Sequence, residues 1–181
     1  YGNHKGAWVN EESITKPTSS NGISRLVAEK SWLSLGLEKN CPIQIFRLSG
    51  IYSNKSNILA RLKSGNVYLI NKQNHFFSRI HVKDISCILF KSLFSFKSCE
   101  IYNISDDKPS SPEEVTLYGA KLLNMNITKK IEIKDIKSEM LKNFYKDSKK
   151  VSNKKMKSFF NYKLKFPTYE EGLNYIRNNI I

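Results

Sequence analysis

The sequence has few cysteines, and their arrangement excludes the usual metal-binding patterns. Three cysteines occur among 181 residues, at Cys41, Cys87 and Cys99. No Cys-x-x-Cys motif or closely spaced His-x-His pair accompanies them, so we expect no metal site. Because they are odd in number and set among apolar neighbours, we expect them to be small buried side chains in a reducing compartment.

Long hydrophobic runs are also missing. No apolar stretch approaches the roughly 18 residues needed to span a bilayer. The first residues, Tyr-Gly-Asn-His-Lys-Gly, lack the charged and apolar regions of a signal peptide. We therefore expect a cytoplasmic protein with no membrane partner. An initiator methionine is absent, and Tyr1 has the character of a strand end, which predicts that upstream sequence is missing.

Arginine is scarce, although the chain is strongly basic. The net charge is +14, but arginine occurs only at positions 25, 47, 61, 79 and 177, and the other basic residues are lysines. Recognition of phosphates and base edges favours the planar guanidinium of arginine. Nucleic-acid binding through the lysine-rich stretch 121–165 is therefore the least favoured function, and the lysines indicate solvated surface.

Hydrophobic spacing and turn residues predict an α/β fold in one domain, or one domain and a small lobe. Ser20 is a candidate N-cap, and Ser111 with Glu114 and Thr168 with Glu171 form candidate capping boxes. The expected helices cover residues 20–36, 57–63, 82–94, 111–123, 138–145 and 153–160, with a last helix after Thr168. The expected strands cover residues 43–48, 67–70, 76–80, 100–104 and 131–133.

Four short motifs occur in a characteristic order. They are Tyr1-Gly2, Phe46-Arg-Leu-Ser-Gly-Ile-Tyr52, Arg79-Ile-His-Val-Lys-Asp-Ile85, and Ile101-Tyr-Asn-Ile-Ser105. Together they resemble the extended short-chain dehydrogenase/reductase family of NAD(P)-dependent epimerases and dehydratases. Gly6-Ala-Trp-Val-Asn-Glu11 and Phe166-Pro-Thr-Tyr169 add likeness to an atypical, YeeZ-like branch of that family.

The resemblance implies the C-terminal part of an NAD(P)-binding Rossmann fold with a small mixed α/β substrate lobe. Residues 1–52 and 76–105 would belong to the Rossmann core, and residues 53–75 and 106–181 to the substrate-side lobe. The cofactor would be NAD or NADP. Its Gly-x-Gly-x-x-Gly phosphate-binding turn, which the sequence lacks, would lie upstream of Tyr1.

The sequence departs from the family at the residues that carry its chemistry. Family enzymes have Tyr-x-x-x-Lys on the long helix, and Asn21 and Arg25 occupy these positions. Asparagine cannot act as a general acid, whereas arginine stays charged and can bind a ribose or a phosphate. Members that bind nucleotide sugars usually have an arginine where Phe77 stands. The catalytic residues are therefore left unassigned.

The resemblance also implies candidate binding residues. Those for the cofactor are Arg25, Leu48, Ser49 and Gly50, and those for the substrate are Arg79 and His81. Each has a structural alternative: a surface ion pair for either arginine, a plain turn for Ser49-Gly50, and a structural hydrogen bond for His81.

Three functions remain open from the sequence. The first is an NAD(P)-dependent epimerase, dehydratase or reductase that acts on a small sugar or carbonyl substrate. The second is a non-catalytic NAD(P)-binding regulatory or scaffold module, and the third is nucleic-acid binding. The long helix 20–36 is a candidate homodimer interface, and we expect Trp8 and Trp32 to pack inside the protein.

Overall fold

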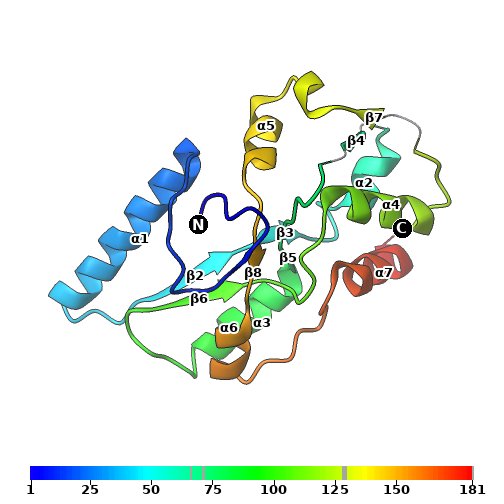
Figure 1. Cartoon of the computed structure of the whole chain (residues 1–181). Helices are drawn as coiled ribbons and strands as arrows, with labels where there is room; N and C mark the ends of the chain where they lie inside the picture. The colour runs from blue at the N-terminus through cyan, green and yellow to red at the C-terminus, as the bar shows by residue number, and fades with distance from the viewer. Residues whose placement is uncertain (66, 71, 128–129, 181) are drawn as a thin grey trace.

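The computed structural model describes residues 1–65, 67–70, 72–127 and 130–180, and it alternates helices with short strands (Figure 1). The strands are β1 (Trp8–Val9), β2 (Gln44–Leu48), β3 (Gly50–Tyr52), β4 (Leu69–Ile70), β5 (Arg79–His81), β6 (Glu100–Ile104), β7 (Lys130–Ile131) and β8 (Lys150–Val151). The helices are α1 (Ser20–Glu38), α2 (Ile58–Lys63), α3 (Val82–Ser92), α4 (Pro112–Leu122), α5 (Glu139–Lys146), α6 (Lys154–Phe159) and α7 (Tyr169–Ile180), with a 3-10 turn at Ile133–Asp135.

Parallel strand pairs form the centre of the molecule. β2 pairs with β6 in parallel, and β3 continues from β2 to pair with β5. Successive side chains of a strand face opposite sides. Phe46 and Tyr102 therefore face the core formed with α3 and α6, whereas Arg47 and Asn103 face α1 and the N-terminal segment. The parallel α/β arrangement agrees with the fold class expected from the sequence.

Two of the four apolar clusters in the described residues contain most of the clustered buried side chains. The larger lies under β5 and β6 and includes Ile80, Ile88, Tyr102, Ile104 and Met156. The second joins β3 to α2, α4 and α7 and includes Tyr52, Leu59, Val115, Leu173 and Ile176. Figure 1 shows α2, α4 and α7 gathered on the side of the molecule away from α1. The boundaries of the Rossmann core and substrate-side lobe stay a prediction.

Small parallel pairs join distant segments around the carboxyl ends of β2 and β6. β1 pairs with β8, and β4 pairs with β7. Phe77 and Ser110 exchange two backbone hydrogen bonds of 3.2 Å in an isolated antiparallel bridge. Ile70 of β4 and Phe77 of the bridge line the cavity described below.

Several side chains expected to be buried lie on the surface. Trp8 and Trp32 are 57% and 56% exposed, so the expectation of internal packing was wrong for both. Cys41 is exposed, and Cys87 and Cys99 are only partly buried, which corrects the expectation of buried cysteines. Apolar sequence neighbours therefore did not predict full burial, although Cys87 still packs against the larger apolar cluster.

Helix α1 differs in detail from the prediction. Its N-cap is Ser19, not Ser20, and the Ser19 hydroxyl accepts a hydrogen bond from the Gly22 amide at 3.2 Å. Gly36 is its only buried residue, so the apolar residues of this helix cover little of the core. Figure 1 shows α1 at one edge of the molecule.

The other predicted elements are present with shifts of a few residues. β6 matches the predicted strand from end to end, whereas the strand expected at 76–80 begins only at Arg79. Residues 128 and 129 of the lysine-rich stretch lie outside the described residues. Within the described parts of the chain, no helix combines the length and the apolar character needed to cross a membrane.

Candidate functional site

A cavity of about 310 Å³ lies where β3, α2, α4, α5 and α7 meet. Strand β3 forms one wall, and the N-terminal turn of α4 forms another. The cavity is lined by Ile51, Tyr52, Ser56, Asn57, Ile58, Arg61, Val67, Tyr68, Ile70, Phe77, Arg79, Pro112, Glu113, Val115, Thr116, Leu141, Phe144, Tyr145, Tyr169 and Leu173. Most of these side chains are apolar or aromatic, as is common in small-molecule sites.

The turn from β2 to β3 passes close to this cavity. The Ser49 amide donates to the Ile104 carbonyl and the Gly50 amide to the Ser78 carbonyl, both at 3.0 Å. A Cβ atom on Gly50 would lie 2.2 Å from the Phe77 ring. Glycine at position 50 therefore lets the aromatic ring pack on the backbone, and β3 continues from there into the cavity wall.

Arg79 is the predicted substrate-binding residue that the structure places in the cavity wall. Its Nη1 donates to the carbonyls of Phe77 and Ser110 at 2.9 and 3.0 Å. The guanidinium also lies 5.2 Å from the centroid of the Phe77 ring. These contacts hold the side chain in one orientation. Burial lowers the pKa of Arg79, yet a guanidinium stays charged at any ordinary pH.

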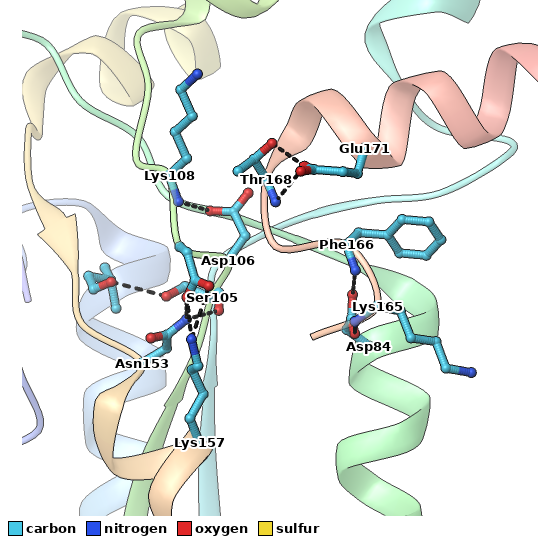
Figure 2. Close-up of polar contacts among 12 residues, drawn as sticks. Asp84, Ser105, Asp106, Lys108, Asn153, Lys157, Lys165, Phe166, Thr168 and Glu171 are labelled. Carbon is cyan, nitrogen blue, oxygen red and sulfur yellow. Dashed lines mark hydrogen bonds and ion pairs between the residues drawn. The ribbon is translucent and has the colours of Figure 1, made fainter. Parts of the chain in front are cut away.

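Asp106 is a buried carboxyl group whose charge acts on Arg79. Its Oδ1 accepts a hydrogen bond from the Lys108 amide at 3.3 Å, and its Oδ2 has no partner in the described parts of the chain. Figure 2 shows Asp106 between Lys108 and Thr168, close to the start of α7. Burial raises the pKa of Asp106 to about 8, although the charge of Arg79 acts in the opposite direction. The carboxyl is therefore largely protonated at neutral pH.

Tyr52 closes the side of the cavity next to α7. Its hydroxyl has no hydrogen-bond partner in the part of the chain that the structure describes. Burial, followed by the charge of Asp106, raises the pKa of Tyr52 far above its ordinary value. The phenol is therefore neutral, and it can donate a hydrogen bond without acting as a base.

His81 does not line the cavity, although the sequence indicated it as substrate-binding. The side chain is fully buried, and its Nδ1 accepts a hydrogen bond from the Lys83 amide at 3.2 Å as the N-cap of α3. Its ring packs 4.3 Å from Phe166 and 5.0 Å from Tyr52, measured between centroids. Burial lowers its pKa. These contacts fix the end of β5, the strand that carries Arg79.

A second buried carboxylate fixes the approach to α7. Asp84 accepts hydrogen bonds from the Tyr162 hydroxyl at 2.7 Å and from the amides of Lys165 and Phe166 at 2.7 and 3.1 Å. Figure 2 shows the two backbone contacts. The aspartate of the Ile-His-Val-Lys-Asp motif thus joins α3 to the segment that supports Tyr169 and Leu173.

The predicted cofactor residues lie outside the cavity. Asn21 and Arg25 are exposed in the first turns of α1, and Leu48 is 44% exposed at the end of β2. Glu29, one turn after Arg25, accepts hydrogen bonds from Arg47 of β2 at 2.6 and 2.8 Å. A helix that returns between parallel strands runs opposite to them, so the N-terminus of α1 lies at the carboxyl end of β2. Arg25 and Leu48 therefore share one end of the molecule.

A second and larger cleft of about 680 Å³ lies between the N-terminal segment and α6, and Trp8, Asn10 and Lys154 lie along it. Asn153 donates to the Ser105 carbonyl and to Asp107 at 2.8 and 2.7 Å, and Lys157 pairs with Asp107 at 3.0 Å (Figure 2). Asp106, whose Oδ2 has no hydrogen-bond partner in the described residues, also lies along this cleft. The mostly apolar and aromatic lining of the first cavity favours that cavity as the functional site.

Most of the cavity wall could not be predicted from the sequence. Phe144 and Tyr145 are neighbours in α5, far along the chain from Arg79, and they form no recognisable motif with it. The run of aromatic residues at 144–145 was a signal, but helical spacing alone assigns such residues to a core.

Several solved structures are similar to the structure of this chain. No protein-family model and no curated protein match the sequence. A conserved protein of unknown function from Silicibacter pomeroyi DSS is 33% identical, with a TM-score of 0.93 over 99% of this chain and 63% of its own. The dTDP-glucose 4,6-dehydratase of Bacillus anthracis str. Ames, solved with NAD, has a TM-score of 0.81 at 20% identity, over 98% of this chain and 57% of its own.

The chain has the fold of the NAD-dependent epimerases and dehydratases. UDP-N-acetylglucosamine 4-epimerase from Bacillus cereus agrees, with a TM-score of 0.73 at 16% identity over 94% of this chain and 59% of its own. The predicted Rossmann-type α/β fold is therefore confirmed. The chain spans less than two thirds of the length of these epimerase/dehydratase-fold proteins.

Proposed function

We propose that this protein is an atypical NAD(P)-dependent epimerase-, dehydratase- or reductase-like protein. The fold agreement over 98% of the chain with a dehydratase solved with NAD is the main support. The cavity adds to it, since open α/β sheets bind ligands beyond the carboxyl ends of their strands. The small-molecule substrate occupies the cavity beside Arg79, and the dinucleotide lies toward α1 and the end of β2.

The proposal gives each predicted residue a role. Arg25 binds a ribose or phosphate of the cofactor, and the Leu48-Ser49-Gly50 turn lies against it. Arg79 orients the substrate through its fixed guanidinium. His81 holds β5 and α3 in place, because its buried ring leaves it no access to the cavity.

The residues at two positions of the long helix α1 favour a second version of the proposal, in which the protein catalyses no reaction. With Asn21 and Arg25 in place of Tyr-x-x-x-Lys, the pair used for proton transfer is absent from these positions. A non-catalytic NAD(P)-binding regulatory or scaffold module accounts for this substitution. The two forms share cofactor binding and differ only in turnover.

Titration with NADH and NADPH, followed by nicotinamide fluorescence, tests both forms. We expect saturable binding by the full-length wild type and about tenfold weaker binding by its Arg25→Met variant, because a charged hydrogen bond is worth roughly 1.5–3 kcal/mol. Lys30→Met, which removes another exposed cation from the same helix, is the matched control and should bind as the wild type does. No binding by the wild type contradicts the proposal. Turnover of carbonyl or hydroxyl substrates then distinguishes the enzyme from the module.

We also propose a homodimer through helix 20–36. The exposed apolar residues of α1, among them Ile23 at 49% and Val27 at 59%, support it. Nucleic-acid binding through residues 121–165 is a weaker alternative, and undetectable affinity for a random duplex at low salt would remove it.

A further inference from the structure

The cavity holds a fixed cation, Arg79, that forms no ion pair among the described residues. Arg79 uses Nη1 for two backbone carbonyls, whereas its Nε and Nη2 have no hydrogen-bond partner in the described parts of the chain. Across the same residues, no carboxylate lies within 4.0 Å of the guanidinium. The Nε–Nη2 edge of an arginine matches the two oxygens of a carboxylate.

The nearby acid does not neutralise this cation. Asp106 exerts the largest attractive charge effect on Arg79, but burial raises the pKa of Asp106 to about 8. At neutral pH the acid is mostly uncharged. A partly buried charge without a partner is unfavourable, so an anionic group that enters the cavity gains most of its electrostatic attraction from Arg79.

The uncharged side chains that line the cavity indicate the chemistry of the rest of the ligand. Aromatic rings of Tyr68, Phe77, Phe144, Tyr145 and Tyr169 surround the space, with aliphatic side chains between them. Such walls stabilise a flat or branched apolar body through burial and ring stacking. The volume of about 310 Å³ is at the low end of ligand cavities, which range over about 300–1,000 Å³.

The charged residues that line the cavity disfavour a diphosphate as its ligand. The only other cation among the lining residues is Arg61, which is exposed, and the carboxylate of Glu113 lies in the same wall. A multiply charged phosphate group would meet one buried cation and one acid. A single carboxylate requires only the one guanidinium that the cavity supplies.

We propose that the cavity binds a small monocarboxylate with an aromatic or branched aliphatic body, held by the Nε–Nη2 edge of Arg79. This inference rests on the proposed function, because it assigns a substrate class to the proposed substrate site. The proposed ligand differs from a nucleotide sugar in both charge and size.

Calorimetric titration without nicotinamide cofactor tests the inference, with 3-phenylpropanoate and its neutral amide as a matched pair of probes. We expect the carboxylate to bind at least tenfold more tightly than the amide, and UDP to bind more weakly than the carboxylate. Arg79→Met should abolish the preference for the carboxylate, and Arg79→Lys should restore part of it. Arg177→Met, which removes an exposed arginine of α7 outside the cavity lining, is the control and should change affinity less than threefold. Equal affinity for acid and amide, or UDP binding that the carboxylate cannot displace, would overturn the inference.

Arg79 also donates to the Phe77 and Ser110 carbonyls, so its replacement can destabilise the fold. A second variant separates that effect from the loss of the binding site. Ile51 is 52% exposed and lines the cavity, so Ile51→Trp should fill the entrance and abolish binding with little change in melting temperature. Unchanged affinity in this variant argues against the cavity as the site. Nicotinamide binding without carboxylate binding overturns this inference alone, whereas carboxylate binding without nicotinamide binding supports it and contradicts the proposed function.

Discussion

Burial sets the charge state of the polar residues around the cavity. Arg79 stays positive because a guanidinium releases its proton only at very high pH. Asp106 and Tyr52 stay neutral because their charged forms would be poorly solvated. At neutral pH Arg79 is therefore a cation in the cavity wall and Tyr52 a neutral phenol, while Asp106, which lies outside the lining, ionises near pH 8. Both the ligand preference of the cavity and the stability of the protein should change when Asp106 ionises.

Replacing Asp106 by asparagine should flatten the pH dependence of stability. Burial raises the pKa of Asp106 from 3.8 to about 8, so the folded protein holds a proton that the unfolded chain releases. Stability should then fall as the pH rises from about 4 to about 8. We expect Asp106→Asn to match the wild type near pH 5 and to be more stable at pH 9, by on the order of 3 kcal/mol.

Urea unfolding at pH values from 5 to 9 measures this effect. Asp107 and Lys108 are the charged neighbours along the chain, and Arg79 and Tyr52 face Asp106 from β5 and β3. Asp135→Asn, at an exposed position, is the control and should follow the wild-type curve. Identical pH slopes for the wild type and Asp106→Asn would show that Asp106 does not titrate in this range.

Replacing Gly172 tests how closely α7 packs against Tyr52 in the cavity wall. A Cβ atom there would lie 2.0 Å from the Tyr52 hydroxyl oxygen and 2.7 Å from its ring. Tyr52 cannot move freely, because it packs against His81. Gly172→Ala should therefore lower the free energy of unfolding by about 2–3 kcal/mol. Adding Tyr52→Phe removes the nearest atom and should restore part of the loss; thermal melting without any such rescue would contradict the packing.

At the scale of elements, local signals fixed the positions of most helices. Ser111 accepts a hydrogen bond from the Glu114 amide at 3.0 Å, and the Ser111 amide donates to Glu114 Oε2 at 2.7 Å. This is the capping box expected from the sequence. At α7 the reciprocal contact is also present, with the Thr168 amide donating to Glu171 Oε2 at 3.0 Å (Figure 2).

Ser111→Ala should lower the free energy of unfolding by about 1 kcal/mol, since it leaves an amide of the first turn without its acceptor. Ser86→Ala is the matched control, because Ser86 lies inside α3, where its hydroxyl donates to the Val82 carbonyl. We expect that control to change stability by less than about 0.5 kcal/mol. Equal effects of the two replacements in chemical denaturation would argue against the cap.

The sequence predicted elements with local signals and missed those made by distant pairing. The five-residue strand β6 was placed from end to end, because its apolar run is bounded by turn residues. Strands β1 and β8 have two residues each, too few to show a period, and they exist only because they pair with each other. The same holds for the cavity wall: Arg79 was found through its motif, whereas Phe144 and Tyr145 reach the cavity only through tertiary packing.

At the scale of the whole molecule, α1 has an apolar surface that stays exposed in the described structure. Glu29 and Gly36 mark its inward side, since Glu29 pairs with Arg47 and Gly36 lies against Ile43 and Cys99. At 100° per residue, Ile23 and Val27 lie on the opposite side. Figure 1 shows this helix at the edge of the molecule. Single exposed apolar residues are common, but neighbouring ones on one helix face mark interaction surfaces.

Replacing both Ile23 and Val27 by serine should therefore weaken the proposed homodimer. Self-association through this face would bury two apolar side chains from each copy, so their loss should raise the dimer dissociation constant at least tenfold. Sedimentation velocity over a range of protein concentrations measures it. Trp32→Ser is the control, because Trp32 is equally exposed but projects about 140° around the helix from Val27. A wild type that stays monomeric at the highest concentration would rule out the dimer, and a larger effect of Trp32→Ser would place the interface on another face of α1.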